Sequence, residues 1–61
     1  MSYMVSATRG MTAMASSAQT AAKAVEWIRS RRAVGAEHFI VIDDHQRQIC
    51  ELELTDRAAR E

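Results

Sequence analysis

Residues 38–54 read HFIVIDDHQRQICELEL, and their apolar side chains recur with a period of two. The first five residues are mostly β-branched or aromatic and lie between turn-forming segments, which predicts a strand. Phe39 and Val41 point to one face of this strand, and Ile40 and Ile42 point to the other. Because both faces are apolar, we expect the strand to lie in the middle of a sheet or to be covered on both sides.

The second half of this segment, residues 47–54, alternates more regularly. Cys50, Leu52 and Leu54 share one face, and the opposite face carries Arg47, Ile49, Glu51 and Glu53, which is typical of a half-buried strand. On that face Cys50 is expected to behave as a small buried hydrophobe. Residues 43–46 supply aspartates that favour a tight turn, so a β-hairpin over residues 38–54 is predicted.

Upstream of the hairpin, residues 16–35 are predicted to form one long helix. Ser16 is the expected N-cap, with Gln19 completing a capping box, and the segment between them and Gly35 contains neither proline nor glycine. Gly35 ends the helix because glycine adopts the left-handed C′ conformation without strain. At about 100° per residue one stripe faces the core. It comprises Met14, Ala18, Ala21, Ala22, Val25 and Ile28.

The length of 61 residues indicates a single small α+β domain. Residues 1–15 form either a lead-in or an edge strand, and residues 55–61 form a tail. The expected architecture is one long helix packed on a small antiparallel sheet, in the order β-α-β-β or α-β-β. A hairpin and one helix bury little apolar surface, so we expect dimerisation to complete the fold.

Composition restricts the choice of partners and location. The net charge is zero, which argues against capture of nucleic acid or of an anionic membrane by bulk electrostatics. No run approaches the roughly 20 apolar residues of a membrane span. Ala13-Met14-Ala15 has the small-x-small form of a cleavage site, but we favour a polar lead-in over a processed leader. The single cysteine is consistent with a cytoplasmic protein.

Trp27 is the leading candidate for an interaction site, because it falls outside the apolar stripe of the helix. Three interpretations remain open. Residues 3–5 fold back over the ring, or Trp27 anchors an interface together with Lys23, Arg31 and Val34, since tryptophan is enriched at binding hot spots. In the third, the ring is half-exposed and has no special role. An exposed strand edge is the other candidate for recognition of a protein partner. The predicted function is therefore a non-enzymatic module that self-associates, as a homodimer, or binds a protein.

Arg29, Arg31 and Arg32 support an alternative function in nucleic-acid binding or regulation. Three arginines at the end of a helix can contact phosphates. The zero net charge weakens this alternative, and a solvated helix end that matches the helix dipole explains the same residues.

Few residues suggest reaction chemistry. Asp43, Asp44 and His45 place carboxylates beside an imidazole, but neighbouring turn residues diverge, and turn formation explains them. Cys50 as a nucleophile with His38 as its base is disfavoured by the apolar face expected for Cys50. We therefore expect no enzyme, no metal site and no cofactor.

The segment from residue 17 to 54 resembles a group of small proteins. An alanine-rich helix and a glycine precede residues 39–44, FIVIDD, and a turn then leads through Arg47 into a second strand that ends in leucine. This pattern is similar to the uncharacterised helix-plus-hairpin proteins of proteobacteria, which have a glycine in the turn where this chain has Gln46. The resemblance implies the architecture and a bacterial source, and it transfers no site residues.

Overall fold

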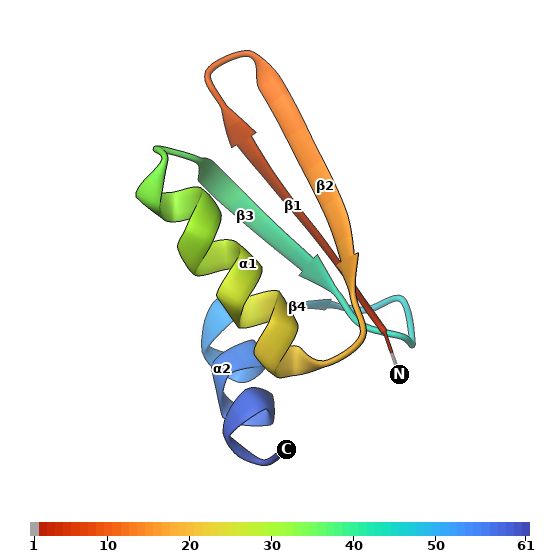
Figure 1. Ribbon diagram of the computed structural model, residues 1–61. Coiled ribbons are helices and arrows are strands. Elements are labelled where there is room, and N and C mark those ends of the chain that lie inside the picture. Colours follow the sequence, from red (N-terminus) through yellow and green to blue (C-terminus); the bar gives the residue numbers. More distant parts are fainter. Residues whose placement is uncertain (1) are drawn as a thin grey trace.

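The computed structural model describes residues 2–61 and shows an α+β fold of four strands and two helices (Figure 1). The strands β2, β1, β3 and β4 lie side by side in that order, and every neighbouring pair is antiparallel. The predicted α+β class is therefore confirmed, although the chain order is ββαββα. The elements are β1 (Tyr3–Arg9), β2 (Thr12–Ala18), α1 (Ala21–Ala33), β3 (Glu37–Ile42), β4 (Gln48–Ile49) and α2 (Glu51–Ala59).

Residues 3–18 form a hairpin instead of a lead-in. Arg9 pairs with Thr12, so the turn consists of Gly10 and Met11, and Gly10 adopts a φ of 61° that glycine tolerates at no steric cost. The predicted strand near the N-terminus is present, but it lies at the centre of the sheet between β2 and β3. A short, weakly apolar segment becomes a strand here because both its edges are paired.

Helix α1 begins later than predicted. Its N-cap is Thr20, whose hydroxyl oxygen accepts a hydrogen bond of 3.1 Å from the Lys23 amide. Ser16, the expected cap, lies in β2 opposite Val5. The backbone of residues 12–18 is paired with β1, and this long-range pairing overrides the local capping signal. At the other end the prediction is confirmed, since Gly35 has a φ of 93°.

The segment predicted as the second strand of the hairpin, residues 47–54, is mostly helix, and so is most of the predicted tail, residues 55–61. The hairpin strand β4 is only two residues long, and α2 follows it directly. Residues two positions apart in a helix are about 200° apart around its axis. Accordingly Leu54 is fully buried while Leu52 is 81% exposed, although a strand would have placed both on one face. The prediction of a hairpin reaching residue 54 is therefore wrong.

The prediction that Cys50 is a small buried hydrophobe is also wrong. Cys50 is exposed and caps α2, where its Sγ accepts a hydrogen bond of 3.4 Å from the Glu53 amide. The acidic Glu51 and Glu53 lie in the first turn of the helix, where they favour its positive end. The alternation of apolar and acidic residues thus belongs to the N-terminus of a helix and not to a half-buried strand.

The core lies between one face of the sheet and the two helices. Both helices cover the same face (Figure 1), and Tyr3, Val5, Ile28 and Leu54 are its largest fully buried side chains. The predicted stripe is correct in part. Ala21 and Ile28 are buried and Val25 is partly buried, but Ala22 is exposed, and Met14 and Ala18 belong to β2.

Strand β3 is interior, as predicted. Phe39 and Val41 face the helices, and Ile40 and Ile42 face the other side of the sheet. A bulge interrupts its pairing with β1, and the extra residue, His38, has a φ of 55°. Helix cover is present on one face only, which leaves the other face of the sheet open to solvent.

None of the helices in residues 2–61 has the length and apolar content needed to span a membrane.

Candidate interaction surface

Trp27 lies on the flank of α1 that faces β2. The ring is half-buried and packs against the core cluster. The guanidinium carbon of Arg31 lies 5.7 Å from the ring centroid, a distance suited to a cation–π contact. Residues 3–5 do not fold back over the ring as one interpretation proposed, because they belong to β1, an interior strand whose buried side chains lie beneath the helices.

A shallow hollow of about 440 Å³ opens beside this ring. It is lined by Ser17, Ala18, Gln19, Lys23 and Trp27, so it runs from α1 to the C-terminal end of β2. Two of the four predicted interface residues, Lys23 and Trp27, therefore meet at the strand edge. The hollow joins the two recognition surfaces that the sequence suggested as alternatives.

The other two predicted interface residues have different surroundings. Arg31 is half-buried above Trp27, on the same flank of the helix. Val34 is the C-cap of α1 and is 46% exposed, at the end of the helix away from the hollow. The structure therefore brings together Lys23, Trp27 and Arg31 but places Val34 outside the hollow.

The outer edge of β2 is the long free edge of the sheet. Its seven residues, TAMASSA, contain no charge, no glycine and no proline. The opposite edge, β4, has only two residues. Proteins normally protect an exposed strand edge with charges, prolines, bulges or short length. β2 has none of these protections, and its register with β1 is regular throughout.

Next to this edge, the open face of the sheet carries the exposed apolar side chains. Met4 is 59% exposed, Ile40 is 42% exposed and Ile42 is 36% exposed. Met4 pairs directly with Ile42 across the two central strands. On β2 the same face presents Ala13, Ala15 and Ser17, which are small side chains that leave room for a close approach.

The three arginines of the alternative function do not form one patch. Arg32 donates a hydrogen bond of 2.8 Å to Glu51 on α2, and its guanidinium carbon lies 5.0 Å from the Phe39 ring centroid. Arg31 lies on the opposite flank, above Trp27. Arg29 is exposed. Two of the three side chains are thus engaged within the fold, on different sides of α1, and nucleic-acid binding stays a prediction.

The Asp43-Asp44-His45 group serves the turn, as predicted. Asp43 is buried, and one carboxylate oxygen accepts hydrogen bonds from the amides of His45 (3.0 Å) and Arg47 (2.9 Å). Its other oxygen is 3.3 Å from the Arg57 guanidinium. The hydrogen bond from Arg47, followed by those from His45 and Arg57, lowers the pKa of Asp43 against the opposing effect of burial. This carboxylate joins the β3–β4 turn to α2.

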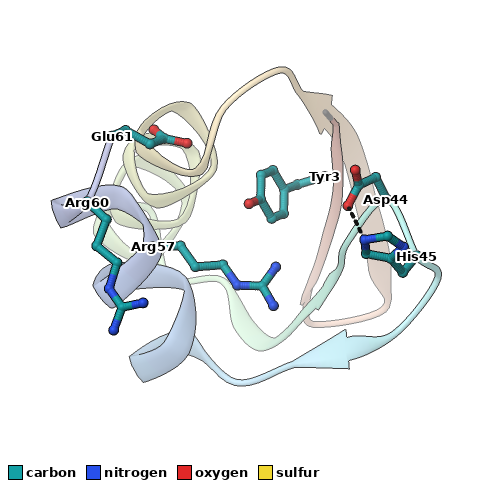
Figure 2. A pocket seen from close by; sticks show the side chains of 6 residues that line it. All are labelled: Tyr3, Asp44, His45, Arg57, Arg60 and Glu61. Carbon is teal, nitrogen blue, oxygen red and sulfur yellow. Dashed lines mark ion pairs between the residues drawn. The ribbon is translucent and has the colours of Figure 1, made fainter.

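A second hollow, of about 380 Å³, lies between this turn and the end of α2. Figure 2 shows the Arg57 side chain directed into the space between Tyr3 and the turn. The hollow is lined by Tyr3, Asp44, His45, Arg57, Arg60 and Glu61. Arg57 binds Asp43 and Glu53, Arg60 binds Asp56, and Asp44 lies 3.9 Å from His45. Only the Arg57–Asp43 pair connects α2 to the β3–β4 turn; the pairs with Glu53 and Asp56 lie within α2, and Asp44 and His45 are neighbours in the turn.

Within residues 2–61, the structure brings together no group of three or more His, Cys, Asp or Glu side chains that would hold a metal ion.

Sequence reasoning missed β2, because its alanines, serines and methionine gave no strand pattern. Gly10, which favours a tight turn, was the one signal in the sequence. Comparisons with protein-family models, with curated proteins and with solved structures found no match.

Proposed function

We propose that this protein is a small non-enzymatic module that works by associating with itself or with a protein partner. The surface proposed for this contact comprises the outer edge of β2 together with Lys23 and Trp27, and it is called the β2–Trp27 surface below. The observation that carries the proposal is the free, uncharged seven-residue edge of β2 next to a half-exposed tryptophan.

The strand edge supplies main-chain groups for recognition. An extended segment that pairs with β2 gains hydrogen bonds to its outward amides and carbonyls, as in other complexes formed by strand addition. Because β2 carries no charge, such a segment encounters no electrostatic barrier along the strand. The absence of edge protection favours association, since a strand of this kind in a purely monomeric protein promotes uncontrolled aggregation.

Trp27 supplies side-chain contact area beside that edge. A tryptophan buries a large surface when a partner covers it, and few residues contribute as much to binding free energy. The stacked Arg31 guanidinium holds the ring in place, so the ring is ordered before a partner arrives. Preorganisation of this kind lowers the entropy lost on binding.

Sedimentation velocity over a micromolar to millimolar concentration range tests the proposal, with Trp27 emission recorded on dilution. We expect the average mass to rise with concentration and the emission spectrum to shift as the ring becomes covered. Trp27→Ala is expected to weaken association. Glu26→Ala, on an exposed position of the same helix, serves as the control. A folded monomer at every concentration, with unchanged emission, would contradict self-association.

A further inference from the structure

We infer that the partner of the β2–Trp27 surface is a second copy of this chain, with the two β2 strands antiparallel and Ala15 opposite Ala15. This inference rests on the proposed function and specifies it. It follows from the direction of the main-chain groups on β2, from the symmetry of the strand, and from the residues that this register brings to the Trp27 hollow.

The hairpin register fixes which way the amides of β2 point. The turn between β1 and β2 has two residues, so the pair that flanks it, Arg9 and Thr12, exchanges main-chain hydrogen bonds. Along an antiparallel ladder, pairs of this kind alternate with pairs that make no such bonds. It follows that Ala13, Ala15 and Ser17 direct their amides and carbonyls away from β1, toward the free edge.

These three positions are arranged symmetrically about Ala15. A two-fold axis through the Ala15 pair places Ala13 opposite Ser17 of the second copy. The outward-pointing amides and carbonyls of one strand then face those of the other strand along the whole edge. The full strand, Thr12–Ala18, is paired in this register. If the register between the two strands shifted by one residue, outward-pointing amides and carbonyls would face residues whose main-chain groups point toward β1. A shift by two residues would leave one end of each strand unpaired.

The same register brings the most exposed apolar side chain to the Trp27 hollow. Met11, at the tip of the hairpin, is fully exposed. With Ala15 opposite Ala15, Met11 stands opposite Gln19 of the second copy, which lines the hollow beside Trp27. A methionine is suited to this position because its flexible thioether fills irregular apolar space and packs well against aromatic rings. This register therefore places each Met11 beside Gln19, at the rim of the other copy's hollow.

Charge is compatible with pairing of two identical strands. β2 has no charged residue, so no like charges meet across the two-fold axis. The nearby cation, Lys23, lines the hollow at the C-terminal end of β2. The axis at Ala15 carries the two Lys23 side chains to opposite ends of the paired strands, about 20 Å apart along the strand direction. At that distance their repulsion is largely screened at physiological salt.

A pair of charge variants tests the register directly. In Ala13→Glu/Ser17→Lys, each glutamate faces a lysine of the second copy; in Ala13→Glu/Ser17→Glu, each faces another glutamate. Within one strand the two positions are about 13 Å apart, so they interact little in the monomer. We expect the Glu/Lys variant to dimerise and the Glu/Glu variant to bind about tenfold more weakly at low salt. Equal dissociation constants for the two variants would overturn the inference.

A second pair of variants tests the free edge. Ala15→Pro removes an outward amide that β1 does not use, and proline is tolerated at such edge positions. We expect Ala15→Pro to keep the circular dichroism spectrum of the native protein and to lose dimerisation, whereas Ala15→Ser keeps both. Met11→Ser is expected to weaken the dimer and to reduce the shift of Trp27 emission.

The outcomes separate this inference from the proposed function. If the native protein dimerises but Ala15→Pro and the Glu/Glu variant dimerise equally well, the second copy binds elsewhere and the inference is wrong, while self-association stands. If the native protein is a folded monomer throughout, both the inference and self-association are wrong.

Discussion

The carboxylate of Glu61 accepts hydrogen bonds from the backbone amides of Ala21 (2.8 Å) and Ala22 (3.0 Å). These amides belong to the first turn of α1, where the intrahelical ladder supplies no acceptor. Thr20 satisfies the next amide, that of Lys23. A negative charge at this position also favours the positive end of the helix dipole. The helix is therefore capped partly by a residue some forty positions away.

Glu61→Ala is expected to destabilise the protein by about 1 kcal/mol, because it removes a charged cap. Urea unfolding measures the loss, and amide exchange at Ala21 and Ala22 should become faster. Glu26→Ala, at an exposed position on the same helix, should change stability by less than about 0.5 kcal/mol. Equal effects for the two variants would show that the cap contributes nothing.

Leu54→Ala and Leu52→Ala form a matched pair on α2. Leu54 is fully buried, so its truncation is expected to reduce the free energy of unfolding by about 2–5 kcal/mol. Leu52 is 81% exposed, and its truncation is expected to leave that free energy within about 0.5 kcal/mol. Thermal and urea unfolding measure both values. Similar losses at the two positions would support a strand in place of the helix.

Asp43 makes the stability depend on pH in the acid range. Its pKa in the folded protein lies below the ordinary value because the Arg47 amide, above all, donates to the carboxylate. Its contribution is therefore complete above the unfolded pKa of about 3.9 and disappears as the pH falls through the lower folded pKa. We expect Asp43→Asn to flatten the decline of the melting temperature below about pH 4. An unchanged profile would contradict this account.

Cys50→Ser is expected to stabilise the protein. Thiol sulfur is a weak acceptor, whereas a serine hydroxyl is among the best N-caps, so the order of stability should be Ser, Cys, Ala, with about 1 kcal/mol between Ser and Ala. Urea unfolding of the three proteins measures this order. Because the thiol is exposed, it should also react with a disulfide reagent in the folded protein. Protection of the thiol until unfolding would contradict the cap.

The sequence predicted those parts of the fold in which local signals and tertiary contacts agree. Gly35 ends α1, the two faces of β3 are assigned correctly, and Asp43 organises its turn. The assignment failed where two local patterns compete. Residues 50–54 alternate like a strand, but burial of Leu54 between helix and sheet stabilises the helical arrangement.

For the candidate site, the sequence pointed to Trp27 and Lys23 but not to the neighbouring strand β2. β2 consists of residues with weak or conflicting propensities, and its conformation depends on pairing with β1. A serine that fits a helix cap fits an edge strand equally well. The hollow beside Trp27 could therefore not be predicted, because it forms only when β2 brings Ser17 and Gln19 next to the helix.

The position of β1 in the middle of the sheet determines the order in which the molecule is completed during synthesis. β1 pairs with β3, which is translated about thirty residues later, and the cap of α1 arrives only with Glu61. A nascent chain therefore holds a hairpin with both edges unpaired until β3 emerges, and two amides of α1 lack their acceptor until Glu61 follows.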